Sequence, residues 1–349
     1  ISIPLVKAEE TEDLAPNAKS AIMIEASTGE ILFQKNKDEK LAPASMTKMM
    51  SMLLIMEEIE NGNLKWNEMI TTSEKASSMG GSQIFLKVGE KMTVEDLLKG
   101  VAIASGNDAV VALAERVSGS EEQFVKRMNI RAKDLGLKNT NFINATGLTA
   151  DNHYSTAYDM SLIAKELVKH EKILEFTSTY EDYLRKDTKS PFWLVNTNRL
   201  VRFKEGVDGL KTGFTDEAGY CLTATMKKDN MRLITVVMKE ENTSKRSADT
   251  TKMLDYGFNI YMVQTILDEK IILEIQRMAE NWLQRIINKL HTHVTDFRTN
   301  PAVFLGGGSL LLRKQIENSP EFKYVEFIDD VRANAIGYEK LTTARLRRG

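Results

Sequence analysis

The first 264 residues combine two patterns of hydrophobic positions. Short apolar runs bounded by glycine, asparagine or charged turns are typical of β-strands, and most of them lie at the two ends of this region. They predict strands over residues 20–26, 31–34, 70–73, 83–86, 192–200, 207–210, 220–226 and 232–238. The first two runs, and the last two, are separated only by short turns, so each pair is expected to form a hairpin.

Between these strands the apolar positions recur at the spacing of helices. The pattern predicts helices over residues 46–60, 93–104, 109–117, 121–135 and 156–170, and a last one over 247–260 that packs back onto the strands. Strands, then helices, then strands predict an α+β fold, in which an antiparallel sheet is flanked by helices and carries an inserted helical lobe.

The helix expected over 46–60 is apolar almost all the way round, which indicates a helix buried inside the domain. Ser45 lies at its start and Lys48 three residues further on, so both side chains share one face. A lysine amine in a desolvated site can lose its proton and activate a serine hydroxyl. Alternatively, Ser45 is only the N-cap of the helix, a role that serine fills well and that the local pattern alone favours.

Composition narrows the classes of function. The 349 residues are 42% hydrophobic and 28% charged, as in ordinary soluble proteins, and a net charge of −2 provides no general attraction for nucleic acid. Four histidines, one cysteine and the lack of a C-x-x-C or H-E-x-x-H motif argue against a metal site. Cys221 is expected to be a small buried hydrophobic residue, and His153 and His170 to be structural.

The start of the chain suggests export. No apolar run reaches the roughly 18 residues that a membrane-spanning helix needs. The sequence begins without Met on an apolar stretch, residues 1–8, that ends near a small residue, as signal peptides do. Residues 1–13 are therefore interpreted as the remnant of a signal peptide and leader, with an ordinary N-terminal segment as the alternative.

Three short motifs follow one another along the chain: Ser45-x-x-Lys48, Ser105-Gly106-Asn107 and Lys211-Thr212-Gly213. Each is weak alone, but together they resemble the serine penicillin-recognising enzymes, whose motifs are S-x-x-K, S-x-N and K-T-G in this order. The sequence most resembles the low-molecular-weight D-alanyl-D-alanine carboxypeptidases, and the resemblance covers about residues 14–262. Residues 14–264 are therefore predicted to form the enzyme domain. Further support comes from the stretches 140–148, 153–160 and 254–258. The resemblance implies a β-lactamase/transpeptidase-like form of the α+β fold.

It also implies a role for each catalytic residue. Ser45 attacks the carbonyl between two terminal D-alanines and forms an acyl-enzyme, with Lys48 as the base. Burial and the nearby Lys211 keep Lys48 neutral. Ser105 passes a proton to the leaving amine, and Asn107 holds Lys48 and the substrate amide. Lys211 adds positive potential near Ser105.

Four further residues are implied to bind the substrate: Thr212, Gly213, Phe214 and Arg246. Thr212 and Arg246 hold the terminal carboxylate. The backbone N–H groups of Ser45 and Phe214 form the oxyanion hole, and the substrate adds to the edge of this strand through main-chain hydrogen bonds. For Arg246 alone, an exposed surface charge is the alternative.

The implied substrate is the peptidoglycan pentapeptide stem, and β-lactams, which mimic D-Ala-D-Ala, are expected to acylate Ser45. No metal or organic cofactor is implied, and no nucleic-acid partner is expected. The family acts at the extracytoplasmic face of the bacterial cell envelope, and its members usually continue into a β-rich domain and a peripheral membrane anchor. No such anchor is recognisable after residue 264.

A class A β-lactamase is the competing kind of enzyme, because it shares the three motifs. Those enzymes activate the deacylating water with a glutamate on a loop between the second and third motifs. Here Ser105-Gly106-Asn107 replaces S-D-N, and Glu166 and Glu171 stand in a helical context rather than in an E-x-x-x-N loop. The sequence therefore favours the carboxypeptidase.

Residues 265–349 do not continue the resemblance. They predict a small α/β segment, with helices over 269–290, 310–317 and 330–340 and strands over 302–305 and 324–328. A glycine turn at 306–308 resembles the one that packs against adenosine in the last part of actin-like plasmid-segregation ATPases. The phosphate-binding hairpins of that fold have no counterpart upstream, so a fused fragment, a divergent accessory domain and a nucleotide-binding module remain open.

Overall fold

The computed structural model describes residues 13–261, 269–290, 302–305, 316–317, 319 and 325–328. The chain divides into two compact units, Ile1–Val263 and Gln264–Gly349. The first unit carries every site residue that the sequence predicts.

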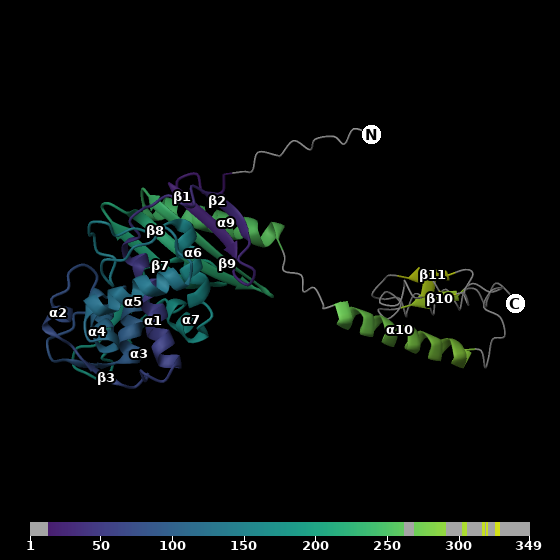
Figure 1. Ribbon diagram of the computed structural model, residues 1–349, viewed down its shortest axis with the longest axis horizontal. Coiled ribbons are helices and arrows are strands. Elements are labelled where there is room, and N and C mark those ends of the chain that lie inside the picture. The colour runs from purple at the N-terminus through teal and green to yellow at the C-terminus, as the bar shows by residue number, and fades with distance from the viewer. Residues whose placement is uncertain are drawn as a thin grey trace. The chain divides into compact units, whose positions relative to one another are not determined.

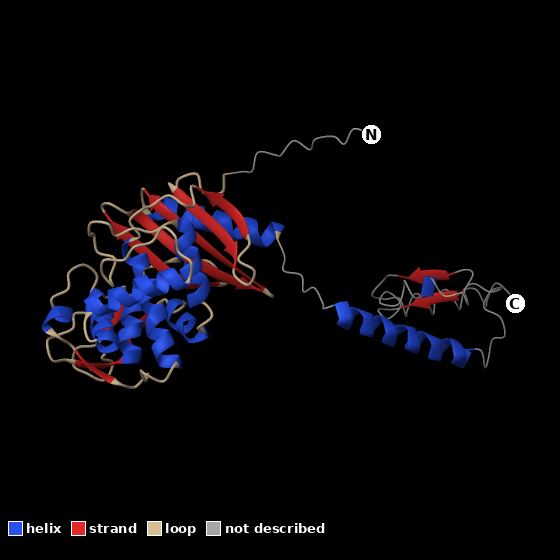
Figure 2. Ribbon diagram, in the orientation of Figure 1, coloured by secondary structure: helices blue, strands red, loops and turns tan. Residues whose placement is uncertain are grey.

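A five-stranded antiparallel sheet forms the centre of the first unit (Figures 1 and 2). Its strands are β1 Ser20–Glu25, β2 Ile31–Lys35, β7 Val207–Thr215, β8 Gly219–Lys228 and β9 Met231–Glu240. Their order across the sheet is β2-β1-β9-β8-β7, which places β7 at one edge. Along β1, Ala21 and Met23 enter one apolar cluster and Ile22 and Ile24 another, so both faces of the sheet are buried.

Helices cover both faces, as predicted for this α+β fold. The helix α9 (Thr243–Ile260) packs on one face and α6 (Ala157–Leu167) on the other. The remaining helices of the unit are α1 Lys48–Glu60, α2 Glu74–Ser77, α3 Val94–Ala102, α4 Asn107–Ser118, α5 Glu121–Asp134, α7 Glu171–Thr177 and α8 Leu200–Phe203. Most of these form the helical lobe (Figure 2).

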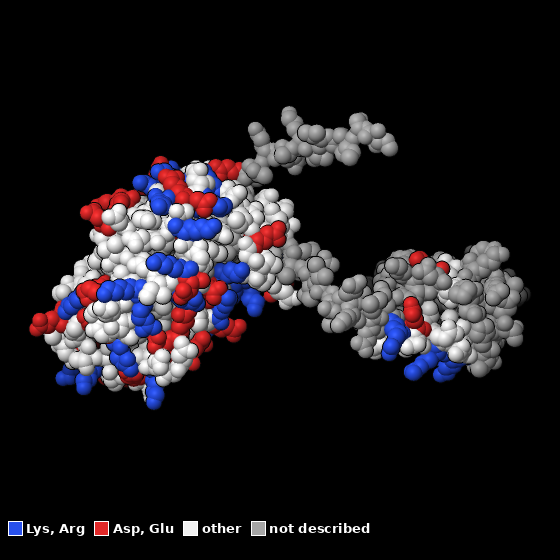
Figure 3. Space-filling model, viewed as in Figure 1, with Lys and Arg blue, Asp and Glu red and all other residues white. Residues whose placement is uncertain are grey.

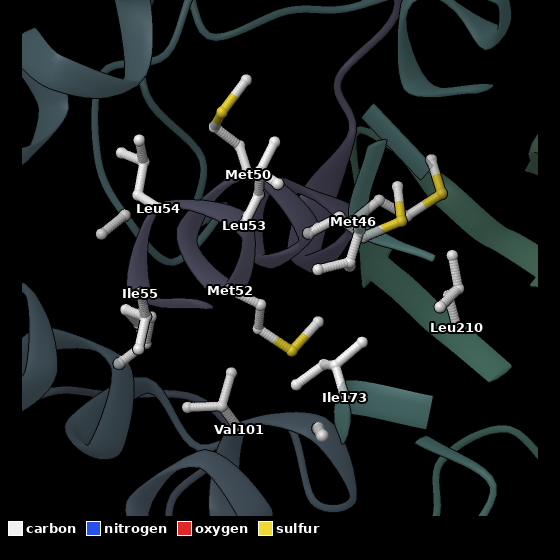
Figure 4. Packing of buried hydrophobic residues seen from close by; sticks show 14 of the residues in the cluster. Met46, Met50, Met52, Leu53, Leu54, Ile55, Val101, Ile173 and Leu210 are labelled. Carbon is white, nitrogen blue, oxygen red and sulfur yellow. The ribbon is translucent and has the colours of Figure 1, made fainter. Parts of the chain in front are cut away.

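The helix α1 is buried inside this lobe, as its apolar sequence predicts. Every residue from 48 to 56 is buried. Figure 4 shows Met46, Met50 and Met52 among side chains from other elements, including Val101 and Ile173. Methionine is unbranched and flexible, so it fills irregular gaps between such elements. The packing fixes α1 on all sides and makes it a rigid support for the residues at its first turn.

The segment 83–86 is not the predicted strand. The N–H groups of Ile84 and Leu86 donate to the carboxylate of Asp108, each at 3.0 Å, instead of to a neighbouring strand. The strand β3 (Met69–Thr71) pairs with β4 (Lys91–Thr93). A buried carboxylate has thus replaced the expected strand pairing.

The strand predicted over 192–200 ends at Val195. Asn196 Oδ1 accepts a hydrogen bond from the N–H of Asn198, whose Oδ1 accepts one from the N–H of Leu200. Asparagine side chains that bond the backbone two residues on form turns, and here they end the strand. The shorter strand, β6 (Phe192–Val195), pairs with β5 (Glu181–Leu184), which the sequence pattern did not predict.

The last helix of the unit starts earlier than predicted. Asn242 is its N-cap and accepts a hydrogen bond from the N–H of Lys245, so α9 begins at Thr243 rather than at residue 247. This start brings Arg246 into the first turns of the helix.

The second unit contains α10 (Glu269–Leu290), β10 (Ala302–Leu305) and β11 (Val325–Ile328), close to their predicted positions. The two strands pair in parallel. The leader up to residue 12, the glycine turn at 306–308, the helix expected over 330–340 and most of that over 310–317 lie outside the described residues.

Charge and hydropathy add two facts about the molecule. On the face of the first unit shown in Figure 3, lysine and arginine side chains alternate with acidic ones, so this face has no continuous basic patch. None of the helices in the described parts of the chain is both long and apolar enough to span a bilayer.

Candidate active site

Ser45 and Lys48 lie at the junction of a 3-10 turn, η1 (Ala44–Thr47), and α1. Lys48 Nζ donates a hydrogen bond of 2.9 Å to Ser45 Oγ and one of 2.7 Å to the carbonyl oxygen of Thr146. Other residues occupy the N-cap positions of the 3-10 turn and of α1, and neither forms a side-chain cap. The interpretation of Ser45 as a helix cap is therefore wrong.

The backbone around the serine is tightly enclosed. Ala44 has φ of +47°, in the left-handed region that residues with side chains rarely adopt. A Cβ on Gly147 would lie 1.8 Å from the carbonyl oxygen of Ala44, and one on Gly213 would lie 2.8 Å from that of Pro43. Two glycines thus allow the loop after α5 and the strand β7 to close on the turn that carries Ser45.

The environment of Lys48 favours a neutral amine. Its side chain is fully buried, and burial lowers the pKa of Lys48 well below its ordinary value. The positive charge of Lys211 lowers this pKa further, whereas the buried Asp108 opposes the shift. A lysine that is neutral and bonded to a serine hydroxyl can accept its proton.

Lys211 lies on β7, and it is also buried. Its Nζ donates to the carbonyl oxygen of Thr212 at 3.0 Å. Burial and, secondly, the charge of Arg246 lower the pKa of Lys211 to about 7. The predicted proximity of Lys48 and Lys211 is therefore present, and the charge of Lys211 disfavours that of Lys48.

The second motif lies in the loop between α3 and α4. Ser105 has φ of +63°, is 3% exposed, and its Oγ has no hydrogen-bond partner among the described residues. Asn107 donates from Nδ2 to the carbonyl oxygen of Gly80 at 2.7 Å, while its Oδ1 is unpartnered. No hydrogen bond joins Asn107 to Lys48, in contrast to the expectation. Two buried polar atoms are left available for a ligand.

The residues expected to bind a carboxylate lie on β7 and α9. Thr212 Oγ1 donates to Thr197 Oγ1 at 2.7 Å. Arg246 is only 5% exposed, its Nε has no partner in the described parts of the chain, and burial lowers the pKa of its guanidinium. The alternative of an exposed surface charge at Arg246 is therefore wrong. A buried, unpaired cation calls for an anion.

Phe214 lies further along β7, and its side chain is 49% exposed. Its ring packs against that of Tyr220 on β8, with centroids 4.4 Å apart. The strand β7 is an edge strand and packs against η1, so it lies next to the turn that carries Ser45.

Sequence reasoning missed three residues near this site. Thr146 supplies the carbonyl that anchors Lys48, and Asp108 binds the loop at Ile84. Thr197 bonds the threonine of the third motif. Thr146 lies in a stretch, 140–148, that supported the resemblance, so a signal existed, whereas Thr197 and Asp108 belong to no motif that was used.

The other candidate groups are structural. His153 is bonded to Thr47 Oγ1 at 2.8 Å, and burial lowers the pKa of His153 to about 4. Cys221 is a free buried thiol whose pKa is raised to about 11 by burial. Within the described ranges, no group of three or more acidic, histidine or cysteine side chains could hold a metal ion. Glu166 lies in α6 and Glu171 begins α7, the helical context that was expected.

Comparison with known proteins identifies relatives over most of the chain. The family described as D-alanyl-D-alanine carboxypeptidase matches residues 6–242. D-alanyl-D-alanine carboxypeptidase DacF of Bacillus subtilis is 62% identical over 251 residues, which are 72% of this chain and 64% of DacF. DacC of Escherichia coli is 37% identical over 280 residues, or 78% of this chain and 69% of DacC. The chain thus spans roughly two thirds of the length of these relatives.

Solved structures have the same fold. Penicillin-binding protein 5 of Haemophilus influenzae matches with a TM-score of 0.66 and 36% identity, over 70% of this chain and 71% of that one. A penicillin-binding protein of Listeria monocytogenes in its cefotaxime-bound form matches with a TM-score of 0.63 and 34% identity, over 69% of this chain and 97% of that one. These matches confirm the predicted fold class.

The actin-like resemblance of residues 265–349 stays a prediction, since the family match ends at residue 242. For the first unit, the order of the three motifs, the fold and the identities agree. The chain belongs to the D-alanyl-D-alanine carboxypeptidase family.

Proposed function

We propose that the chain is a serine D-Ala-D-Ala carboxypeptidase that removes the terminal D-alanine from peptidoglycan stem peptides. The observation that carries this proposal is the 2.9 Å hydrogen bond between Lys48 Nζ and Ser45 Oγ in a buried site whose electrostatics favour a neutral lysine. Family membership supports the choice of substrate.

In the first step Ser45 Oγ attacks the carbonyl carbon of the penultimate D-alanine, while its proton passes to Lys48 Nζ. The carbonyl oxygen becomes an oxyanion, which the backbone N–H groups of Ser45 and Phe214 stabilise. The amide C–N bond then breaks. Its nitrogen takes up a proton, relayed from Lys48 through the unpartnered hydroxyl of Ser105, and D-alanine leaves as the amine.

The substrate is held on both sides of this bond. Its backbone pairs with the free edge of β7 at Gly213, as a sixth strand would. The free Oδ1 of Asn107 accepts a hydrogen bond from the substrate amide. Thr212 and the unpaired guanidinium of Arg246 bind the terminal carboxylate, and this contact selects a chain end.

Water completes the cycle. It attacks the ester carbonyl of the acyl-enzyme and gives a proton to Lys48, and the C–O bond to Ser45 breaks as the serine regains its proton. The peptide leaves one residue shorter. All these steps use side chains and water, and no cofactor is invoked.

β-Lactams are proposed as inhibitors. A related penicillin-binding protein was solved with cefotaxime bound. A β-lactam carries a reactive amide next to a carboxylate, as D-Ala-D-Ala does, and would acylate Ser45 by the first step above. The proposed place of action is the extracytoplasmic cell envelope, where peptidoglycan lies.

The β-lactamase alternative has less support. The two glutamates considered for water activation lie in helices, and Glu166 pairs with Lys169 at 2.6 Å. We expect a D-Ala-D-Ala peptide to be hydrolysed with rapid turnover and a cephalosporin to be turned over far more slowly. The opposite order would establish the β-lactamase.

Labelling with a fluorescent penicillin tests the nucleophile. The wild type should be labelled and release D-alanine from a D-Ala-D-Ala peptide, whereas Ser45→Ala should do neither. Ser190→Ala, in an exposed loop, is the matched control and should behave as the wild type. Equal labelling of Ser45→Ala and the wild type would refute the assignment.

A further inference from the structure

A cavity of about 630 Å³ lies between the turn after β6, α8 and the first turns of α9. It adjoins the proposed carboxylate site, because Arg246 and Thr197 line it and Thr197 accepts the hydrogen bond of Thr212. Pockets for small molecules typically measure about 300–1,000 Å³, so this one can hold more than the single D-alanine that leaves there.

The cavity carries two positive charges and no negative one. Arg199 and Arg246 both line it, and none of the described residues that line it is acidic. Arg246 is 5% exposed with an unpartnered Nε, and neither arginine forms an ion pair among the described residues. Burial lowers the pKa of Arg246, and the charge of Arg199 also acts in this direction. The terminal carboxylate of a D-Ala-D-Ala peptide neutralises only one of these two guanidiniums.

The residues that line the cavity suit a ligand whose short apolar side chain ends in a second carboxylate. Ser244, in the first turn of the 18-residue helix α9, lines one side, where backbone N–H groups and the helix dipole favour an anion. Leu200 and Phe203 also line the cavity, and Phe203 is 70% exposed. Apolar surface beside two guanidiniums matches methylene groups that end in a carboxylate. Arg199 precedes the first residue of α8, and its carbonyl accepts from the N–H of Arg202 at 3.1 Å, so its backbone is held.

We propose that this cavity, the Arg199 subsite, accepts a C-terminal D-glutamate, so that the chain releases acidic D-amino acids as well as D-alanine. The proposal rests on the proposed carboxypeptidase function. Arg246 and Thr212 hold the α-carboxylate, and Arg199 pairs with the side-chain carboxylate. The same amide C–N bond breaks. The peptide that ends in the penultimate residue is transferred to Ser45 Oγ as an ester, and the leaving nitrogen receives its proton by the same relay.

The test compares three N-acylated peptides that end in D-Ala-D-Ala, D-Ala-D-Glu and D-Ala-D-Gln. The last two differ in charge and hardly in size. Release of the terminal amino acid gives kcat/KM for the wild type, for Arg199→Gln and for Arg202→Gln. Arg202 is the matched control, because it is an exposed arginine of α8 that lies over the rings of Tyr180 and Phe203 and does not itself line the cavity.

We expect the wild type to favour D-Glu over D-Gln by about threefold, because Arg199 is exposed and solvent screens its pairing with a carboxylate. Arg199→Gln should lose this preference and retain its rate on D-Ala-D-Ala. Arg202→Gln should resemble the wild type on all three peptides. Equal rates on D-Glu and D-Gln in the wild type would overturn the proposal, as would an equal loss on all three peptides in Arg199→Gln.

Binding to Ser45→Ala separates this proposal from the proposed function. In calorimetric titrations, D-glutamate should bind more tightly than D-glutamine, and Arg199→Gln in the same background should abolish the difference. If no peptide is hydrolysed and this difference persists, the carboxypeptidase fails and the acidic subsite stands. If D-Ala-D-Ala is hydrolysed and the two amino acids bind alike, the subsite fails and the carboxypeptidase stands.

Discussion

At the scale of single residues, the site depends on two amines held out of water. Lys48 and Lys211 are both buried, and the charge of Lys211 is the second cause of the lowered pKa of Lys48. The protonation of Lys48 is therefore set partly by a residue from a strand far along the sequence. This coupling can be measured, because in the proposed mechanism acylation by a β-lactam requires neutral Lys48, so its rate falls as the pH falls.

Replacing Lys211 with methionine should move the acid limb of the acylation profile to higher pH. The charge of Lys211 lowers the pKa of Lys48, so its removal raises that pKa, and a higher pH is then needed to free the base. The measurement is the rate constant of penicillin acylation against pH. Lys211→Arg keeps the charge and should keep the limb in place. If the acid limb of the Lys211→Met profile stayed at the pH of the wild type, the coupling between Lys211 and Lys48 would be contradicted.

Gly147 provides a second test at this scale. Alanine there would place Cβ 1.8 Å from the carbonyl oxygen of Ala44, so Gly147→Ala should displace the turn of Ser45 and reduce acylation at least about 100-fold. Gly62 also has a positive φ but no atom within 4 Å of its would-be Cβ. Gly62→Ala should lower the free energy of unfolding by about 1 kcal/mol and leave the acylation rate unchanged. Similar acylation by both variants would show that the close approach is unimportant.

At the scale of elements, the part of the molecule that the sequence predicted well is the part where local pattern and packing agree. The apolar run after Ser45 forms the buried helix α1, and α10 lies at its predicted position. Predictions failed where a distant side chain supplied the hydrogen bonds. Asp108 binds the N–H groups of Ile84 and Leu86, and no local periodicity contains that information.

The same reason explains which site residues were found. Ser45, Lys48 and Lys211 stand in short motifs, so an ordered set of patterns indicated them. Thr197 contributes through a contact with Thr212, 15 residues away, and belongs to no motif. That pairing depends on a turn, which two asparagine side chains impose and which interrupts an apolar run.

The junction of β9 and α9 contains a buried carboxyl group whose effect on stability can be predicted. Glu240 is 1% exposed, and neither of its oxygens has a hydrogen-bond partner among the described residues. Burial and, secondly, the charge of Asp249 raise the pKa of Glu240 from 4.5 to about 8. The folded state therefore binds more protons than the unfolded state between these values, and its stability falls as the pH rises from 4.5 to 8.

Glu240→Gln removes this titration. Its free energy of unfolding, measured with urea, should increase relative to the wild type between pH 5 and pH 9. The control is Glu241→Gln, because Glu241 is an exposed neighbour whose side chain pairs with Lys245 in solvent. The difference in free energy of unfolding between Glu241→Gln and the wild type should stay nearly constant with pH. A pH-independent difference for Glu240→Gln would mean that Glu240 is ionised at no extra cost.

At the scale of the whole molecule, the residues of the candidate site all belong to the first compact unit. A chain that ends at residue 263 should therefore be acylated by penicillin within about twofold of the full-length rate, since a compact unit with its own core can fold alone. The two rate constants are the measurement. A much slower truncated chain would assign the second unit a part in the reaction.

The same pair of chains tests the resemblance of residues 265–349 to an actin-like ATPase. Neither chain should bind ATP, because the phosphate-binding hairpins of that fold have no counterpart in the sequence. Equilibrium titration with labelled ATP is the measurement. Micromolar binding by the full-length chain, but not by the truncated chain, would establish a nucleotide site in the second unit.

The burial of Lys48 also bears on how this chain can evolve. Burying the amine of Lys48 costs free energy that burying the thioether of methionine, a side chain of similar length, does not. In a copy of the chain that no longer needs the proposed reaction, methionine could replace Lys48 and avoid this cost, at the loss of the hydrogen bonds to Ser45 and Thr146. Retention of the lysine in a divergent copy would thus mark a lineage in which selection for the reaction continues.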